Sequence, residues 1–591
     1  MSTIEMQAIE GYASVSSVYP GETISFQVRT QTPNSHFEIE IHRIGKENTL
    51  VHSGSGTASD YSTPDNASEA GCGWPPGYSL IIPDNWSSGV YIARFTSAVE
   101  VLPRGATTDV LFVVKAKAPG KNSKILLQLT LATYQAYNYW GGKSLYTDPP
   151  AFKVSFNRPD SNSWEFFYER DFIQWLENNK FEVEYCTGID LHANPDLLSN
   201  YQLLLSVGHD EYWSWEMRDN VEAFIGNGGN IAFFSGNVCW WQVRFEDNNR
   251  TMVCYKNAQA DQNANPGIDP HRLTVNWIDP LVGRRENRMT GVSYEEGGDW
   301  YDPDPIFSRP VVGYTVRLSQ HWIFDNTNLK NTDKFGAESL IVGYEADAAL
   351  FKETLGIPQV TGTDETPMNF QVLATADLSN WAVGKNRSGP NDDGTGKATL
   401  GIYRNNGLVF TAATVDWFRG LTGAWNVIQQ ITHNVITRLS CPCTLSPDIA
   451  NSGFEKWSGM AGSQPDHWVL EGQGNISREE TLRINGKYSL KIDATAGRTW
   501  ISQGSFNCEG RNNYRVACWA KADHPGATIR LQSTGSWRDF ATASHSGTGN
   551  WEYLSAVGVV NDEGPIFPAR VKLQLDQGVI AFFDNVAVEV F

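Results

Sequence analysis

The chain has 591 residues, more than a single hydrophobic core organises, so we expect several domains. Its formal net charge of −20 argues against nucleic acid and against an anionic membrane surface as partners. No apolar run reaches membrane-spanning length, and the first residues, MSTIEMQAIEGYASVSS, lack the basic and apolar parts of a signal peptide. We therefore expect a cytoplasmic protein; secretion by a non-classical route would leave the same sequence.

Residues 1–117 carry the alternation of apolar and polar residues that is typical of half-buried strands. TISFQVRT and HFEIEIHRI show this period of two, and VYIARFTS and DVLFVVKA follow with turn residues between them. The pattern predicts a β-sandwich of the immunoglobulin type. A short basic linker, KAKAPGKNSK, comes next.

Residues 123–440 show a different pattern, in which apolar strands alternate with helical segments. KILLQLTLATY is a predicted strand, WEFFYERDFIQWLENN a helix, and FEVEYC a second strand. An apolar run at 203–207, a helix at 215–225 with Ser214 as its N-cap, and a run at 231–234 repeat the order. This alternation predicts a doubly wound α/β catalytic domain, similar to Rossmann and glutamine-amidotransferase domains, which a helix at 425–439 completes.

Residues 446–591 return to short strand patterns after the boundary stretch SCPCTLSPDIANSG. The opening NSGFEKW and the closing FFDNVAVEVF resemble the ends of jelly-roll modules that often bind carbohydrate. We therefore expect a third domain, a jelly-roll β-sandwich, with a glycan as a candidate ligand. Core packing is the more common role of tryptophans such as those of this region.

Polar side chains follow two neighbouring strands of the expected parallel sheet. His209 and Glu211 come directly after the run at 203–207, and Asn237 follows the run at 231–234. Open α/β sheets bind their ligands at the carboxyl ends of the strands, so these groups can converge on one site. The alternative is that His209 and Glu211 cap the following helix and face solvent.

Further donors stand beside other strands of this domain. The stretch TYQAYNYWGGKSLY brings Tyr134, Tyr137 and Tyr146 after the first strand, and Lys256 and Glu345 accompany later strands. Phenolates and carboxylates are hard anionic oxygen donors, which suit a hard cation such as ferric iron. Such an ion can polarise a carbonyl and activate water. The alternative is that the tyrosines pack in the core.

Eight blocks of the sequence, in order, resemble the large (beta) subunit family of N,N-dimethylformamidase. They span roughly residues 10–440 and are ATYQAYNYWGGKSLY, FIQWLENNKFEVEYCTGIDLH, LLLSVGHDEYWS, NIAFFSGNVCWWQVRFE, RTMVCYK, HWIFDNTNL, LIVGYEAD and GLVFTAATVDWFRGL. Characterised members of that family hydrolyse N-substituted formamides and are similar to one another in using a mononuclear iron held by two tyrosines and one glutamate. The resemblance implies the same activity and cofactor here.

The resemblance also assigns the metal ligands. Glu211, in GHDEY, corresponds to the carboxylate ligand, although Asp210 replaces the proline of the family's GHPEY. Tyr137 corresponds to one phenolate. Tyr91, in NWSSGVYIARF, is the preferred second phenolate, and Tyr146 and Tyr134 are alternatives to it.

Four further residues take catalytic roles by the same resemblance. His209 would be the acid–base group, and Glu345 would assist proton transfer. Asn237 and Lys256 would form hydrogen bonds to the substrate or to water at the site. The sequence thus predicts an iron-dependent hydrolase of small amides, with a small subunit or a second copy of the chain as partner. The alternative is a carbohydrate- or surface-binding protein with an inert α/β core.

Overall fold

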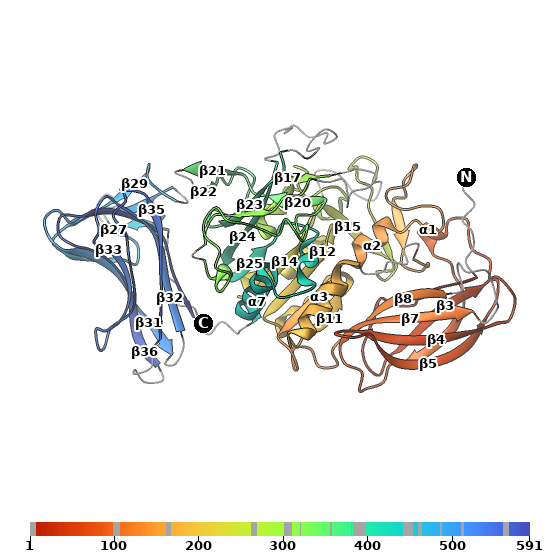
Figure 1. Cartoon of the computed structure of the whole chain (residues 1–591). Helices are drawn as coiled ribbons and strands as arrows, with labels where there is room; N and C mark the ends of the chain where they lie inside the picture. Colours follow the sequence, from red (N-terminus) through yellow and green to blue (C-terminus); the bar gives the residue numbers. More distant parts are fainter. Residues whose placement is uncertain are drawn as a thin grey trace. The chain divides into compact units, whose positions relative to one another are not determined.

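The computed structural model of the chain is shown in Figure 1. It describes residues 8–97, 107–160, 167–261, 269–300, 310–319, 321–354, 357–379, 381, 396–440, 453–458, 464–484, 487–509, 513–559 and 566–590. The chain forms two compact units: residues 1–316, 333–349 and 374–441 make the first, and residues 317–332, 350–373 and 442–591 make the second. The expected division into domains at 1–117, 123–440 and 446–591 stays a prediction.

The first unit begins with a β-sandwich, as the alternating pattern predicts. One sheet has the order β1(Ile9–Ala13), β3(Thr23–Thr30), β6(Pro76–Ile81); the other has the order β2(Ser17–Val18), β8(Thr107–Val114), β7(Gly89–Ser97), β4(Ser35–Ile44), β5(Thr49–Ala58). Apolar residues of both sheets close the core: the ring of Phe26 lies 5.4 Å from that of Phe95 and 5.6 Å from that of Phe112. Edge-to-face contacts of this kind add to the area that the rings bury. The short helix α1(Ala67–Ala70) precedes β6.

A nine-stranded mixed sheet forms the centre of the first unit. Five parallel strands lie in the order β11(Glu184–Thr187), β9(Ile125–Leu129), β12(Leu203–His209), β14(Asn230–Gly236), β25(Gly407–Thr411). The order continues with β24(Lys397–Asn405), β23(Gln371–Asp377), β18(Tyr314–Val316), β19(Lys334–Phe335). β24 runs antiparallel to β25, and β18 runs antiparallel to both its neighbours.

Both faces of the parallel strands are covered by side chains. On β14, Phe234 contacts Phe172 of α3(Phe167–Asn178) with ring centres 5.1 Å apart. The adjacent Phe233 points the other way, toward Trp213, with ring centres 6.4 Å apart. Because neighbouring residues of a strand face opposite sides, the two contacts show that each side of the sheet is packed. The other long helices are α5(Trp215–Gly226) and α7(Val427–Ser440), and Ser214 caps α5 by accepting from Met217 N–H.

The expected doubly wound, Rossmann-like domain is not supported as a whole. The protein is rich in β-structure, and only α3, α5 and α7 reach twelve residues within the part of the chain that the structure describes. β24 and β25 are joined by Asn406 alone, which has a φ of 58°. So short a connection allows only an antiparallel hairpin, whereas a parallel crossover needs a dozen or more residues. The remaining helices are α2(Leu131–Tyr137), α4(Gly188–Ala193), α6(Asn287–Thr290) and the 3₁₀ turns η1(Leu197–Asn200), η2(Pro270–Arg272), η3(Trp322–Phe324) and η4(Trp417–Leu421).

Two small sheets lie beside the central one. The first has the order β10(Lys153–Ser155), β16(Thr251–Val253), β15(Trp241–Glu246), β13(Tyr212–Ser214), and the second pairs β17(Ser293–Asp299) with β20(Glu345–Ala348). β13 begins three residues after the end of β12. These sheets supply side chains to the site described below.

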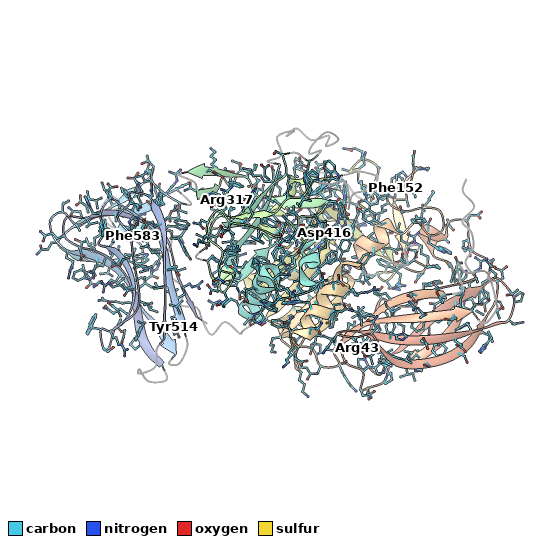
Figure 2. All side chains as sticks on the ribbon, viewed as in Figure 1. Arg43, Phe152, Arg317, Asp416, Tyr514 and Phe583 are labelled. Carbon is cyan, nitrogen blue, oxygen red and sulfur yellow. The ribbon has the colours of Figure 1, made fainter. Side chains whose placement is uncertain are left out.

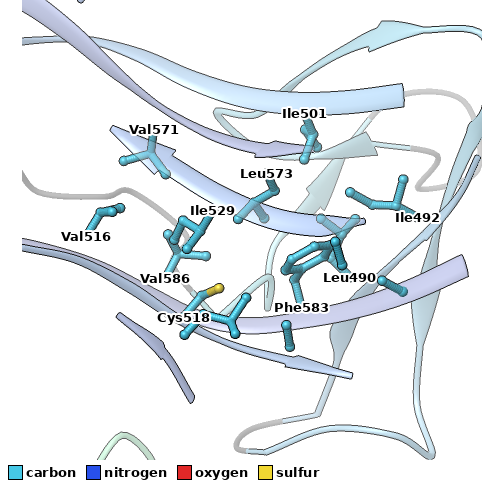
Figure 3. Close-up of a cluster of buried hydrophobic side chains, with 14 of the residues drawn as sticks. Leu490, Ile492, Ile501, Val516, Cys518, Ile529, Val571, Leu573, Phe583 and Val586 are labelled. Atoms are coloured by element: carbon cyan, nitrogen blue, oxygen red, sulfur yellow. The ribbon is translucent and has the colours of Figure 1, made fainter. Parts of the chain in front are cut away.

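The second unit is a β-sandwich of two five-stranded sheets, as expected for the C-terminal region. One has the order β28(Val469–Gly472), β31(Thr499–Glu509), β36(Ile566–Leu575), β33(Ala527–Ser533), β34(Asp539–Ser544); the other has the order β29(Asn475–Glu479), β30(Ser489–Asp493), β37(Ile580–Val590), β32(Asn513–Ala522), β35(Trp551–Val559). Aliphatic and aromatic side chains fill the space between the sheets, among them Leu573, Ile529 and Phe583 (Figures 2 and 3).

Two segments from the middle of the sequence belong to this second unit, which the sequence did not predict. Asp325 pairs with Arg515 of β32 at 2.9 Å. Gln359, in the hairpin β21(Phe351–Thr354)–β22(Ile357–Val360), donates from Nε2 to the Arg483 carbonyl at 2.8 Å. The unit also contains the two-stranded pair β26(Trp457–Ser458) and β27(Gln464–Pro465). Among the described residues, no helix is long and apolar enough to cross a membrane.

Candidate active site

The site begins at the carboxyl end of β12, where the chain turns sharply into β13. Gly208 has a φ of 78°, and a Cβ atom built on it would lie 2.2 Å from the Cβ of Tyr168. Only glycine fits both the left-handed backbone and this close approach. The turn buries His209 and Glu211 next to each other, each no more than 3% exposed.

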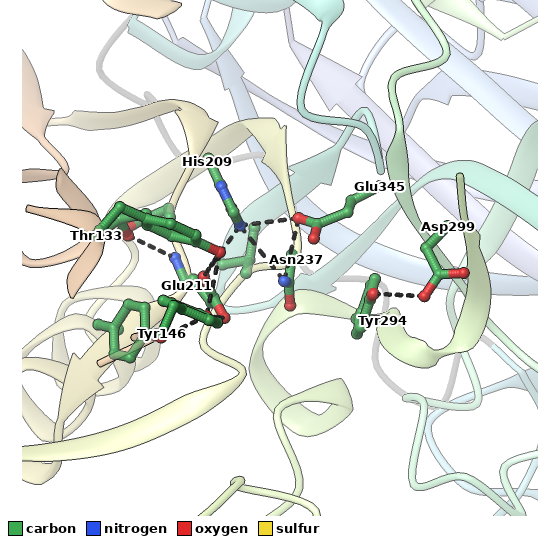
Figure 4. A network of polar contacts seen from close by, with 12 residues as sticks. Thr133, Tyr146, His209, Glu211, Asn237, Tyr294, Asp299 and Glu345 are labelled. Atoms are coloured by element: carbon green, nitrogen blue, oxygen red, sulfur yellow. Dashed lines mark hydrogen bonds and ion pairs between the residues drawn. The ribbon is translucent and has the colours of Figure 1, made fainter. Parts of the chain in front are cut away.

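Two phenols and one carboxylate meet at Glu211. Tyr137, at the end of α2, donates to Glu211 Oε2 at 3.0 Å, and Tyr146 donates to Glu211 Oε1 at 2.8 Å (Figure 4). The two hydroxyl oxygens are 3.1 Å apart, and their rings stack with centres 4.3 Å apart. The Glu211 backbone N–H donates to Thr133 Oγ1 at 3.0 Å, so α2 fixes both the carboxylate and one phenol.

A histidine and a second carboxylate border this cluster. His209 Nε2 lies 2.9 Å from Glu345 Oε2 and 3.2 Å from Glu211 Oε2. Burial alone would lower the pKa of His209, but the charges and hydrogen bonds of Glu345 and Glu211 outweigh it and raise the pKa to about 10. On the far side of the ring, Nδ1 lies 3.3 Å from the Tyr344 hydroxyl, which in turn lies 3.0 Å from that of Tyr168.

Asn237 completes this side of the site, at the end of β14. Its Nδ2 donates to Glu345 Oε2 at 3.2 Å. The residue has a φ of 49°, and its backbone N–H donates to Asp347 Oδ1 at 2.8 Å. Its Oδ1 is buried and has no hydrogen-bond partner within the described part of the chain. A buried acceptor without a partner is costly, so this atom is free to accept a hydrogen bond from water or from a ligand.

Lys256 lies against the aromatic wall of the site. Its Nζ is 3.5 Å from the centre of the Tyr146 ring and 4.9 Å from that of Trp241. Burial lowers the pKa of its ammonium group. The Tyr212 hydroxyl lies 2.6 Å from that of Tyr146. Lys256 therefore contacts Tyr146, one of the two phenols that meet Glu211. The sequence had placed Lys256 only beside a later strand.

The structure does not bring Tyr91, the preferred second phenolate, to Glu211. Tyr91 points into the core of the N-terminal sandwich, where its ring stacks on Trp86 with centres 4.8 Å apart and its hydroxyl donates to the Ser87 carbonyl at 2.7 Å. It faces inward with the alternation of β7 and so packs as a core residue. Of the two alternatives, Tyr134 donates to Glu169, and Tyr146 is the phenol that meets Glu211.

Sequence reasoning missed several partners of the site. Tyr212 and Asp347 carried an available signal: Tyr212 ends the GHDEY block, and Asp347 follows Glu345 by two residues on a strand, so both carboxylates share one face. Thr133, Tyr168 and Tyr344 gave no such signal, because their roles depend on contacts between distant segments.

The donors present fit a hard metal ion. The hydroxyl oxygens of Tyr137 and Tyr146 lie 2.8–3.1 Å from each other and from the Glu211 carboxylate. Two oxygens bound to one ion at about 2 Å each are about 2.8 Å apart when they meet at a right angle. In the described ranges, His, Cys, Asp and Glu side chains by themselves form no group of three or more that could hold a metal ion.

The sequence matches a family of known proteins. Residues 38–432 match the family model described as N,N-dimethylformamidase beta subunit-like, C-terminal. The chain is 25% identical over 294 residues to the N,N-dimethylformamidase beta subunit of Paracoccus aminophilus and 23% identical over 293 residues to that of an Alcaligenes species. Each match covers 46% of this chain and 37% of the relative, so the chain spans little more than a third of their length.

Solved structures resemble a smaller part of the chain. The CBM22-1 xylan-binding domain of Paenibacillus barcinonensis is 14% identical, with a TM-score of 0.19, over 24% of this chain and 91% of that domain. The active domain of tailspike protein 4 of bacteriophage CBA120 is also 14% identical, with a TM-score of 0.19, over 24% of this chain and 21% of its own.

Since the family model spans about two thirds of the sequence, the chain belongs to the N,N-dimethylformamidase beta subunit-like family.

Proposed function

We propose that this protein hydrolyses the C–N bond of small formamide-type amides with a mononuclear iron ion held by Tyr137, Tyr146 and Glu211. The observation that carries the proposal is the convergence of two phenols on one buried carboxylate. Three hard oxygen donors at these separations suit ferric iron. Membership of the dimethylformamidase-like family supports the same reaction class.

Iron bound to these donors would supply Lewis acidity, which polarises a carbonyl and activates water. The chain's own residues would then manage the protons. His209 holds a proton on Nε2 between Glu211 and Glu345, where it can be given to the departing amine nitrogen. Overall, water adds to the acyl carbon, the C–N bond breaks, and a carboxylic acid and an amine result.

Asn237 would orient the substrate, and Lys256 would orient the Tyr146 ring. The unpartnered Oδ1 of Asn237 is a ready acceptor for an O–H or N–H group beside His209. Lys256 would keep Tyr146 in place by contact with its ring face, since a cation is attracted to the electron-rich face of an aromatic ring. His209 and Asn237 are both buried, which strengthens the polar interactions that they make.

Phenylalanine substitutions test the iron site directly. Tyr137→Phe and Tyr146→Phe should each lower the iron content and remove or shift the tyrosinate-to-iron absorption band. Both variants should also lose hydrolysis of N,N-dimethylformamide. Tyr91→Phe is the matched control and should keep the iron content, the absorption band and the hydrolysis of the wild type. A band and an iron content that survive in Tyr137→Phe and Tyr146→Phe alike would contradict the proposed ligands.

We also infer that the parallel strands β11, β9, β12, β14 and β25 form a doubly wound core like that of glutamine amidotransferases. Their order and the packing on both faces support this. The relatives are named as beta subunits, which supports association of this chain with a small subunit or a second copy. The mass of the purified protein in solution, measured by light scattering, tests that partner.

A second candidate function belongs to the C-terminal sandwich. Trp537, in the turn between β33 and β34, is 60% exposed, which is unusual for so large an apolar ring. We propose that this sandwich binds a glycan while the other unit carries the chemistry.

A further inference from the structure

The outer face of one sheet in the second unit is polar, whereas its inner face is mostly apolar. Ile501, Leu573 and Ile529, on three adjacent strands, point into the core. The residues that alternate with them point outward. We call this set the cationic face; its members are Glu471, Trp500, Ser502, Thr528, Arg530, Gln532, Asp539, Arg570, Lys572 and Gln574.

A network of hydrogen bonds fixes most of the cationic face. Arg570 pairs with Glu471 at 3.1 Å and donates from Nε to Gln532 Oε1 at 3.0 Å. Gln532 donates to Asp539 at 2.7 Å, and Arg530 pairs with the same carboxylate. Both arginines therefore have an acidic partner, and their side chains are held in place before any ligand arrives.

Lys572 is the exception, and it lies at the centre of the face. It is paired in register with Ser502 on one side and Arg530 on the other. Among the described residues it has no hydrogen bond or ion pair, and its Nζ lies 4.3 Å from the centre of the Trp500 ring. Burial, together with the charges of Arg570 and Arg530, lowers the pKa of Lys572. Three cations and two carboxylates leave one positive charge uncompensated here, on a chain whose net charge is −20.

Two tryptophans add aromatic rings and a hydrogen-bond donor to the cationic face. The buried Nε1 of Trp500 has no hydrogen-bond partner within the described residues, so the face holds an unused donor as well as an unused cation. Trp537 stands at its edge, with Arg570 4.7 Å from the ring centre and most of the ring exposed. An open aromatic ring beside hydrogen-bond donors suits a sugar, which has both apolar C–H faces and polar hydroxyls.

We propose that the cationic face binds a polysaccharide whose sugars carry carboxylates, such as a uronic acid polymer. A sugar ring would stack on Trp537, and a carboxylate would pair with Lys572, beside Arg530. The inference rests on the proposed glycan binding of this sandwich and adds the chemical class of the glycan. Hydrogen bonds to charged groups are stronger than neutral ones, so the carboxylate would decide selectivity.

Binding of the full-length protein to polygalacturonic acid tests this proposal, with fully methyl-esterified polymer as the matched neutral ligand. We expect the acidic polymer to bind at least about tenfold more tightly, and Lys572→Gln to remove that difference. Lys491→Gln is the matched control, because Lys491 lies on the other sheet and loses the same charge. Trp537→Ala should weaken binding of both polymers.

Each of the other possible outcomes would contradict a different part of the proposal. Equal binding of the acidic and esterified polymers would overturn the acidic preference and leave glycan binding intact. An equal loss in Lys572→Gln and Lys491→Gln would reduce the effect to overall charge and overturn the assigned site. No binding of either polymer would overturn both glycan proposals, while amide hydrolysis, measured on the same samples, reports separately on the first unit.

Discussion

At the scale of single residues, the site depends on how a few side chains are held around Glu211. His209 connects two carboxylates, and the side-chain amide of Asn237 donates to one of them, Glu345. The contacts with Glu345 join segments that are more than 100 residues apart in sequence. The chemistry therefore depends as much on the residues that fix these groups as on the groups themselves.

His209→Ala should retain iron and lose turnover. The imidazole contacts the Glu211 ligand without being one of the three proposed donors, and its proton is needed for the departing amine. A loss of about two to four orders of magnitude in kcat is the usual range for such a group. His192→Ala is the control, since His192 bonds to Ser214 near the start of α5. Turnover within a few-fold of the wild type in His209→Ala would contradict this role.

Asp347 should act as a positioning residue. It accepts hydrogen bonds from the backbone N–H groups of Asn237 and Val238 and so holds Asn237 in its left-handed conformation. Asp347→Ala should lower kcat by about tenfold or more, as small misplacements of catalytic groups do. The double variant with Asn237→Ala should be no slower than Asn237→Ala alone. Additive losses would show that Asp347 acts independently of Asn237.

At the scale of elements, the link between β12 and β13 is the most constrained. Gly208→Ala should destabilise the first unit by about 2–4 kcal/mol, because the new methyl group meets Tyr168 and the backbone has a positive φ. Gly226→Ala is the matched control: its added methyl group meets nothing within 4 Å, and alanine in α5 should be neutral or slightly stabilising. Urea denaturation measures both. Equal stability of the two variants would contradict the steric argument.

The N-terminus of α6 should make stability depend on pH. Glu286 is fully buried, Ser293 donates to its Oε1, and its Oε2 has no partner within the described residues. Burial raises the pKa of Glu286 from 4.5 to about 7. Because the folded value lies above the unfolded one, this group's stabilisation is complete below about pH 4.5 and is lost as the pH rises through 7.

Glu286→Gln should remove this dependence, which corresponds to about 3 kcal/mol. Relative to the wild type, the variant should gain stability as the pH rises from 5 to 8. The difference in unfolding free energy between the two proteins at each pH is the measurement. A difference that stays constant, or that falls with rising pH, would contradict the assignment.

The same elements show what the sequence could predict. The period of two in HFEIEIHRI predicted β4, and the order of β12, α5 and β14 followed from apolar runs and a cap, because such patterns depend only on near neighbours. The antiparallel half of the central sheet was missed because β18, β19 and β23 come from separate stretches of the chain, and the pattern of one strand does not say which distant strand it pairs with. The core position of Tyr91 was not foreseen, because an inward-facing core tyrosine and a metal-binding tyrosine look alike in sequence.

At the scale of the whole molecule, the second unit combines the C-terminal sandwich with two inserted segments. Arg515→Ala should remove the pairing with Asp325 and lower the stability of that unit by about 1–2 kcal/mol, since Asp325 is partly exposed. Arg498→Ala, which breaks an exposed pair with Asp576, is the control and should have little effect. Differential scanning calorimetry gives the stability, and iron content should be unchanged in both. Loss of iron in Arg515→Ala would show that the two units unfold together.

The inserted segments also have a consequence for synthesis of the protein. Residues 317–332 and 350–373 leave the ribosome before the strands of residues 442–591 against which they pack. During translation they must therefore wait for their partners, while β20, which lies between them and carries Glu345 and Asp347, belongs to the unit already made. Chains fold largely from the N-terminus as they emerge, so unpaired segments at this stage are exposed to misassembly and to chaperones. The final quarter of the protein thus decides when the middle of the chain can finish folding.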